Sequence, residues 1–318
     1  MTYNFDPELR DIIPLLPIGL FDDPVAARAL MLDVVRAMNA GLDFSALQID
    51  DRSIPGYADA PDVTVRVYTP TGRKARVPGL LYIHGGGFTV GDLDTEHGLA
   101  GEFSRELGIV VVSVAYRLAP EHPYPAGLHD CYAALSWMHA NAARLAIDPA
   151  RIGVCGQSAG GGLAAGLTLM ARDMRGPAIC FQALGIPELD DRLATPSMQR
   201  FTDTPLVNRP VAELSWQMYL GDMAPGSPGV PAYAAPARAT DLSGLPPAYV
   251  TAMEFDPLRD EDILYALAML QAGVAVELHT YPGTFHGSGV VPHAAVSQRY
   301  NQDVLGALSR GLRVQEQD

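Results

Sequence analysis

The chain has 318 residues, of which 48% are hydrophobic and 18% charged, and its formal net charge is −14. A surface this acidic repels phosphate groups and anionic lipids, so the charge argues against nucleic acid and membrane surfaces as partners. The three cysteines form no CxxC pair, which disfavours a disulfide framework and fits a reducing compartment. No signal-peptide pattern and no membrane-length apolar run occurs, so we expect a cytoplasmic protein.

The first part of the chain differs from the rest in its pattern. Residues 1 to about 53 contain two helical patterns and no predicted strand. Residues 63–70 then alternate apolar and polar side chains, which is typical of a half-buried strand at a sheet edge. The sheet is therefore expected to begin only after residue 53.

From residue 79 onward, short apolar runs alternate with helical patterns. Strands buried on both faces are predicted over 79–85, 109–116, 148–155 and 178–186. Helices are predicted over 95–107, 127–146 and 161–174. This regular alternation predicts a parallel sheet with helices packed on it.

Residues 188 to about 236 interrupt the alternation. This stretch is rich in proline, methionine and aromatic residues and has no strand pattern. Long insertions in a compact domain often serve as lids or binding elements. We interpret it, together with residues 1 to about 53, as a small helical cap over one end of the sheet. The alternative is that the N-terminal helices only cover the core.

The alternation resumes after the insertion. Strands are predicted over 248–255 and 276–283, with a helix over 259–273 between them and a closing helix over 293–314. The whole pattern predicts an α/β protein, with one domain over residues 1–318 and a mostly parallel sheet covered on both faces. In such sheets, ligands bind where the strands end at their carboxyl side.

The segment GQSAG, residues 156–160, lies where a predicted strand meets a predicted helix. It matches G-x-S-x-G in the context that a nucleophile elbow requires, with Ser158 at the tip of the turn. Glycines flank the serine because larger side chains would clash in so tight a turn. The amide of Ala159 would lie at the helix N-terminus, where it can donate to an anion. Taken alone, the motif also fits a packing turn or a phosphate-binding turn.

A second glycine-rich segment, HGGGF at residues 84–88, follows another buried strand. Its backbone amides could stabilise the negative oxygen of a tetrahedral intermediate, as a serine hydrolase requires. The alternative is a turn around a cofactor phosphate, but neither G-x-G-x-x-G nor the P-loop motif occurs. No H-E-x-x-H motif occurs either, so we expect neither a cofactor nor a metal.

A serine nucleophile needs a base and a group that orients the base. His286 lies just past the last predicted strand, in a glycine-rich loop, and Asp256 ends the preceding strand 30 residues earlier. The order serine, acid, histidine is that of α/β-hydrolases. Glu254 competes for the acid role but falls inside the strand, and Asp256 before Pro257 also fits a helix cap. Four other histidines fall in a turn or in regular elements: His122, His129, His139 and His279.

Several motifs together resemble the hormone-sensitive lipase family, family IV, of α/β-hydrolase esterases. They are HGGGF, YRLAPEHPYPA at residues 116–126, GQSAGG, DPLRDE at residues 256–261 and FHG around His286. The resemblance implies Ser158 as nucleophile, Asp256 as acid and His286 as base. It also implies an oxyanion hole formed by the backbone amides of Gly85, Gly86 and Ala159.

The resemblance extends beyond these residues. It implies that His84 braces the oxyanion loop, that a helical cap covers the site and that the protein forms a homodimer through edge elements. One position departs from the family pattern, because members usually carry an acidic residue or threonine where this chain has Gln157. That departure can alter the pH optimum and the substrate preference. Plant relatives that are dehydratases or receptors often have an altered triad, whereas the pattern here is intact.

We therefore expect a serine carboxylesterase that hydrolyses short- to medium-chain esters through an acyl-enzyme. A small-molecule ester is the expected partner. Two rival functions remain at this point: a non-catalytic ligand-binding protein of the same fold, and an amide hydrolase using the same residues. Five side chains could either line an apolar pocket or pack the cap onto the body: Phe88, Phe201, Trp216, Met218 and Tyr219.

Overall fold

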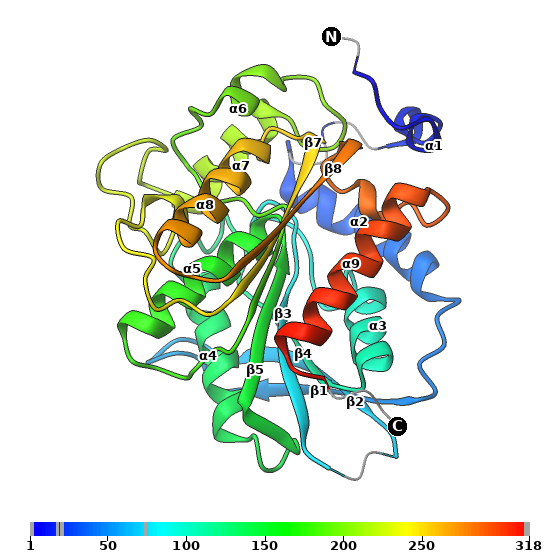
Figure 1. Ribbon diagram of the computed structural model, residues 1–318, viewed down its shortest axis with the longest axis vertical. Helices are drawn as coiled ribbons and strands as arrows, with labels where there is room; N and C mark the ends of the chain where they lie inside the picture. The colour runs from blue at the N-terminus through cyan, green and yellow to red at the C-terminus, as the bar shows by residue number, and fades with distance from the viewer. Residues whose placement is uncertain (1–2, 17–18, 20–21, 73–74, 315–318) are drawn as a thin grey trace.

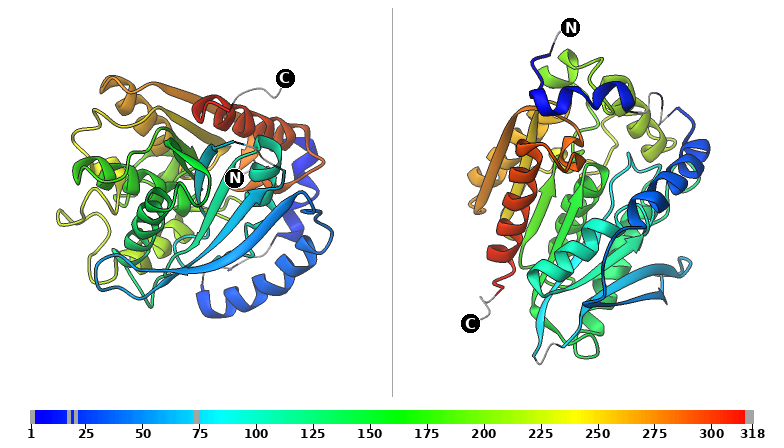
Figure 2. Two further views of the ribbon diagram at one scale, coloured as in Figure 1. Left: turned by 90° about the horizontal axis from the view of Figure 1, so that it is seen from below. Right: turned by 90° about the vertical axis from the view of Figure 1, so that its right-hand side faces the viewer.

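The centre of the molecule is an eight-stranded sheet with helices on both of its faces (Figures 1 and 2). The computed structural model describes residues 3–16, 19, 22–72 and 75–314. The strands are β1 (Leu47–Ile54), β2 (Val63–Pro70), β3 (Val77–Ile83), β4 (Val110–Ala115), β5 (Ile147–Gln157), β6 (Gln182–Gly185), β7 (Ala248–Phe255) and β8 (Val276–Phe285). The α-helices are α1 (Pro7–Arg10), α2 (Pro24–Asn39), α3 (His97–Leu107), α4 (Ala126–Ala140), α5 (Ala159–Asp173), α6 (Pro196–Arg200), α7 (Arg209–Leu220), α8 (Arg259–Gln271) and α9 (Ala295–Gly311). The described residues also form three short 3₁₀ helices: η1 (Ile13–Leu15), η2 (Pro236–Arg238) and η3 (Ser288–Val290).

The strand order in the sheet is β1-β2-β4-β3-β5-β6-β7-β8. All neighbours from β4 to β8 in this order are parallel, whereas β2 is antiparallel to both β1 and β4. The α/β class and the mostly parallel sheet are thus confirmed. Because the parallel strands all end on the same side, the loops that follow β3, β5, β7 and β8 lie together at one edge.

The prediction of no strand before residue 53 is wrong. β1 pairs with β2 along its whole length, so β2 lies second from the edge rather than at the edge. Only the two end residues of β1, Leu47 and Ile54, are buried, so its apolar periodicity is too weak to be recognised. Pairing holds this edge strand instead, aided by an ion pair in which Arg66 of β2 lies 2.6 Å from Asp51.

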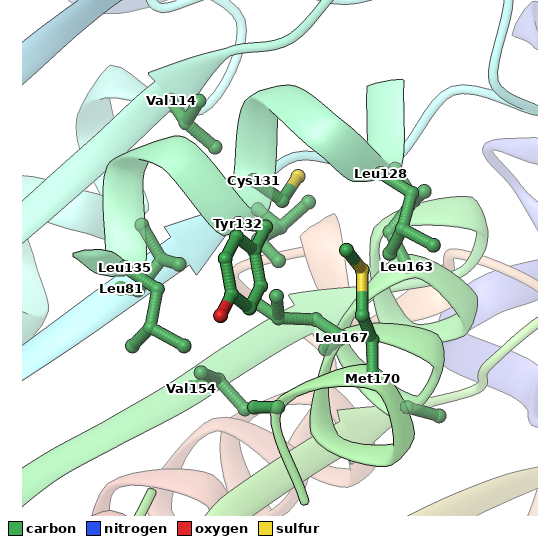
Figure 3. Packing of buried hydrophobic residues seen from close by; sticks show 14 of the residues in the cluster. Leu81, Val114, Leu128, Cys131, Tyr132, Leu135, Val154, Leu163, Leu167 and Met170 are labelled. Atoms are coloured by element: carbon green, nitrogen blue, oxygen red, sulfur yellow. The ribbon is translucent and has the colours of Figure 1, made fainter. Parts of the chain in front are cut away.

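Apolar side chains cover both faces of the sheet. On one face, α4 and α5 pack against β3, β4 and β5, and Figure 3 shows their interdigitated side chains. Labelled there are Leu81, Val114, Leu128, Cys131, Tyr132, Leu135, Val154, Leu163, Leu167 and Met170. On the other face, a second cluster joins the sheet to α3 and α9 through Tyr82, Phe103 and Leu308. The helix predicted over 127–146 ends earlier, at Ala140.

The helices of the first residues and of the 188–236 insertion gather at one end of the molecule. α1, α6 and α7 lie at the end toward which β7 and β8 run (Figures 1 and 2). Aromatic stacking fixes α7 there, because the rings of Tyr219 and Phe88 stack with centroids 3.9 Å apart. Trp216, on the same helix, is fully buried. These residues pack α7 onto the loop after β3.

Candidate active site

Ser158 lies in the sharp turn between β5 and α5. Its φ of +55° belongs to a conformation that is strained for a residue with a side chain. The turn leaves no room at its neighbours: a Cβ on Gly156 would lie 2.2 Å from the carbonyl oxygen of Gly160. A Cβ on Gly160 would lie 2.2 Å from the carbonyl oxygen of Ile83, at the end of β3. The two glycines are therefore required because the turn packs tightly against the first residues of α5 and against the end of β3.

Three predicted site residues form one hydrogen-bonded chain. The Nε2 atom of His286, which directly follows β8, lies 2.9 Å from the Oγ of Ser158. Its Nδ1 atom lies 2.7 Å from the Oδ2 of Asp256, which directly follows β7 and is fully buried. The other oxygen of Asp256 accepts a hydrogen bond of 2.9 Å from the amide of Leu258, so this carboxylate also caps the turn into α8. The end of the sheet thus brings together residues that are up to 128 positions apart.

The competing candidates have other partners. The Oε2 of Glu254 accepts a hydrogen bond of 2.7 Å from the amide of Gly283. His139 donates to the carbonyl of Ala178 at 2.8 Å, and His279 lies 3.3 Å from Asp303. His122 and His129 have no hydrogen bond with Ser158 among the contacts of the described residues. Among the residues that the structure describes, only His286 forms a hydrogen bond with the hydroxyl of Ser158.

Two of the predicted oxyanion-hole residues adjoin Ser158: Ala159 follows it in the chain, and a Cβ on Gly85 would lie 3.6 Å from the Cβ of Ser158. Within the described ranges, the amides of Gly85, Gly86 and Ala159 make no hydrogen bond to another protein group. Gly86 has a φ of +112°, and a Cβ there would lie 2.3 Å from the carbonyl oxygen of Val90. Ala159 begins α5, where the unpaired amides and the helix dipole favour an anion. The three amides are therefore free to donate to a negatively charged oxygen.

His84 holds the loop after β3 in place. Its Nδ1 donates to the carbonyl oxygen of Gly85 at 2.8 Å, and its ring stacks on Tyr116 with centroids 4.2 Å apart. Tyr116 in turn donates to the carbonyl oxygen of His84 at 3.0 Å. Burial lowers the pKa of His84 to about 4, so its imidazole is neutral at pH 7. These contacts suit a brace for the loop and not a proton carrier.

A cavity of about 650 Å³ opens above Ser158 and His286. Its wall is largely apolar and includes residues from α2, α7, α9 and the loops between them: Val35, Leu206, Val211, Ala212, Val290 and Tyr300. None of the five side chains that could line a pocket or pack the cap is a lining residue, and the four aromatic ones are buried: Phe88, Phe201, Trp216 and Tyr219. Of the two interpretations of these aromatic residues, the structure favours packing.

Two carboxyl groups in the cavity wall were missed by the sequence analysis. Glu188 is only 3% exposed, and burial raises its pKa to about 8. Glu96 accepts a hydrogen bond of 3.0 Å from Tyr82, and burial raises its pKa to about 7. No motif marks either residue, although Glu188 closely follows β6, at the sheet edge where ligands are expected.

Gln157 also lines the cavity, next to the serine. Its Oε1 accepts a hydrogen bond of 2.8 Å from Tyr300 of α9. A Cβ on Gly185 would lie 2.4 Å from the same oxygen, so β6 confines the amide on its other side. The neutral side chain that departs from the family pattern is therefore held in a fixed position beside Ser158.

The described ranges hold neither a metal-binding cluster nor a membrane-spanning helix. Nowhere in them do three or more histidine, cysteine, aspartate or glutamate side chains cluster as a metal ion would need. The helices in the same ranges include none with the length and apolar character needed to span a bilayer.

Known proteins similar to this chain share its fold and most of its length. A family model described as the alpha/beta hydrolase fold matches residues 80–289. Carboxylesterase NlhH of Mycobacterium tuberculosis is 41% identical over 317 residues, which cover 97% of each chain. Esterase LipI of the same organism is 38% identical over 297 residues, covering 91% of this chain and 90% of the relative. The solved structure of a bacterial heroin esterase is 53% identical with a TM-score of 0.95, and the match covers 98% of each chain.

The matches to carboxylesterase NlhH and to the heroin esterase structure extend over nearly the whole chain, whereas the family model begins within β3. The motifs that suggested the resemblance, from HGGGF to DPLRDE, fall inside the matched residues. The chain therefore belongs to the α/β-hydrolase fold family, in its branch of hormone-sensitive-lipase-like esterases.

Proposed function

We propose that this ester hydrolase is a serine carboxylesterase in which Ser158, His286 and Asp256 carry out the reaction through an acyl-enzyme. One observation supports this most strongly: the hydrogen-bonded chain from Ser158 Oγ through His286 to Asp256 lies at the floor of a large cavity. The proposed substrates are short- to medium-chain carboxylic esters.

The mechanism follows from this geometry. His286 takes the proton of Ser158 through Nε2 as the hydroxyl oxygen attacks the ester carbonyl. Asp256 holds the imidazole through Nδ1 and stabilises the imidazolium that forms. The amides of Gly85, Gly86 and Ala159 bind the oxyanion, and each such donor contributes about 3 kcal/mol to transition-state stabilisation. His286 then protonates the leaving alcohol, and a water molecule hydrolyses the acyl-enzyme by the same steps.

The cap is part of this proposal. Because β1 belongs to the sheet, the N-terminal share of the cap is limited to the helices before about residue 40, and residues 188–236 supply the rest. Side chains from both segments, including Val35 and Val211, line the cavity. Such a cap would enclose the acyl or alcohol part of a small ester. Faster hydrolysis of emulsified long-chain lipid than of butyrate esters would contradict this substrate range.

The Ser158→Ala variant tests the serine mechanism. We expect it to lose at least about 10⁴-fold in kcat for p-nitrophenyl butyrate while its circular dichroism spectrum stays unchanged. An organophosphonate should label the native protein at Ser158 and leave the variant unlabelled. A native protein that resists labelling and hydrolysis would instead be a ligand-binding relative, and one that cleaves the matched amide as fast as the ester would be an amide hydrolase.

We further propose that the protein forms a homodimer and acts in the cytoplasm. β8 is one of the two edge strands of the sheet, and the neighbouring α8 carries three half-exposed leucines: Leu264, Leu267 and Leu270. A second copy could cover this surface, and light scattering of the native protein and of Leu267→Glu would test it. Three free cysteines suit a reducing compartment, which cell fractionation would check.

A further inference from the structure

The cavity above Ser158 carries more acidic than basic side chains. Glu96, Glu102 and Glu188 line it, and its described lining residues include one arginine, Arg105, no lysine, and the proposed catalytic base His286. Arg105 is already engaged, because its guanidinium lies 2.8 Å from the carboxylate of Glu106. The cavity therefore offers negative charge to a ligand and little positive charge.

Glu188 differs from the other two glutamates in its surroundings. Its side chain is only 3% exposed, and its Oε1 has no hydrogen-bond partner among the described residues. Its Oε2 lies 3.2 Å from the hydroxyl of Ser215, but that hydroxyl also lies 3.1 Å from the carbonyl oxygen of Gly87. A hydroxyl has one proton, so it can donate to only one of these oxygens at a time. Glu188, which is a lining residue of the cavity, thus retains at least one acceptor oxygen without a hydrogen-bond partner.

The backbone places Glu188 beside the reaction centre. Its amide donates a hydrogen bond of 3.1 Å to the carbonyl oxygen of Ser158. Through Ser215, its carboxyl group is one hydroxyl away from Gly87 in the oxyanion loop. A substrate whose carbonyl occupies the oxyanion hole would therefore present its substituents near this carboxyl group.

We propose that Glu188 binds a substrate ammonium group, so that the preferred esters of this enzyme carry a protonated amine. This inference rests on the proposed esterase function and names its substrate class. A buried carboxyl oxygen without a partner is unfavourable, and a charge-assisted hydrogen bond from an ammonium group would satisfy it. The cavity presents no competing free cation among its described lining residues.

The protonation state of Glu188 agrees with such a role. Because burial raises its pKa to about 8, the group is neutral in the empty cavity at pH 7 and does not repel the developing oxyanion. An arriving ammonium group favours the ionised carboxylate and becomes its partner. Glu96 suits the role less well, since Tyr82 already donates to its carboxylate at 3.0 Å.

The ammonium group could belong to the alcohol or to the acyl part of the ester, and matched substrates separate the two. On the alcohol side, 2-(dimethylamino)ethyl acetate is compared with 3-methylbutyl acetate, its neutral isostere. On the acyl side, ethyl 3-(dimethylamino)propanoate is compared with ethyl 4-methylpentanoate. At pH 7 the native enzyme should show a kcat/KM about 10- to 100-fold higher for the amine of at least one pair, as expected for a hydrogen bond to a charged group.

Variants then test whether Glu188 causes the preference for amine substrates. Glu188→Gln should lose this preference while still hydrolysing the neutral isosteres, which also shows that the variant is folded and that the esterase function stands. Glu213→Gln is the matched control, because it makes the same change on α7 at an exposed residue outside the cavity, and it should keep the preference. The proposal is overturned if the native enzyme hydrolyses the amine of neither pair faster than its isostere. It is also overturned if Glu188→Gln retains the preference or if Glu96→Gln abolishes it instead.

Discussion

The two sides of the cavity are constructed differently. On the sheet side, main-chain groups at the strand ends form the candidate reaction centre, and the turns there leave no space for a Cβ at Gly86 or Gly160. On the cap side, side chains from α2, α7 and the loops form the wall. Main-chain constraints restrict which residues can occupy a short segment, so they produce recognisable sequence motifs. A wall formed by side chains from distant segments produces no such motif. The type of reaction can therefore be predicted from the sequence more readily than the substrate can.

The largest expected effect comes from comparing two carboxylates on the sheet side, Asp256 and Glu254, which are two residues apart. Asp256→Asn should reduce kcat/KM for p-nitrophenyl butyrate by about 10⁴-fold, because the imidazole of His286 would lose its anionic partner at 2.7 Å. Glu254→Gln should change it less than about tenfold, since a glutamine oxygen can still accept from the amide of Gly283. A large loss in the Glu254 variant, with Asp256→Asn active, would reverse the assignment of the acid.

A pair of glycine substitutions compares the sheet side with the insertion directly. Gly160→Ala should lower kcat by about 100-fold or more, because its Cβ would lie 2.2 Å from the carbonyl oxygen of Ile83 and must displace the serine turn. Gly229→Ala, in the insertion, has nothing within 4 Å of its Cβ and should leave kcat and the melting temperature unchanged. Steady-state kinetics and thermal unfolding measure both. Equal behaviour of the two variants would refute the claim that packing, and not chain flexibility, requires the glycine at 160.

The same contrast explains how much the sequence could predict. The alternation of apolar runs predicted every strand from β2 to β8, and the motifs singled out the three side chains that the structure joins in one hydrogen-bonded chain. β1 was missed because pairing and an ion pair, not burial, hold it. Glu188 was missed because a lone carboxyl group has no periodicity or motif. Its importance depends on burial, which only the folded chain reveals.

Glu188, the buried glutamate of the cavity wall, should also make the free energy of unfolding depend on pH. Its pKa is raised from 4.5 to about 8, so the folded state binds more protons than the unfolded state between these values. The free energy of unfolding should therefore fall as the pH rises from about 5 to about 8. Glu188→Gln should reduce this fall by about 1–3 kcal/mol in urea titrations at the two pH values.

Two features sharpen that measurement. Glu96, with a pKa raised to about 7, contributes in the same direction and stays in the variant, so the decline should become smaller without disappearing. The exposed Glu213→Gln control should show the native pH dependence. An unchanged decline in Glu188→Gln would mean that this carboxyl group titrates normally in the folded chain.

The smallest expected effect concerns Gln157, whose backbone belongs to the serine turn and whose side chain belongs to the cavity wall. Gln157→Glu keeps an acceptor for the hydroxyl of Tyr300 but adds a negative charge beside Ser158. That charge favours the protonated imidazole, so the acid limb of kcat/KM should move to higher pH by less than about one unit. Tyr300→Phe removes the 2.8 Å hydrogen bond without adding charge, and it should alter KM while leaving the limb in place. Profiles from pH 5 to 9 for both variants separate the two causes, and a limb that moves in Tyr300→Phe alone would show that the hydrogen bond, not the absent charge, distinguishes this chain from relatives with an acidic residue there.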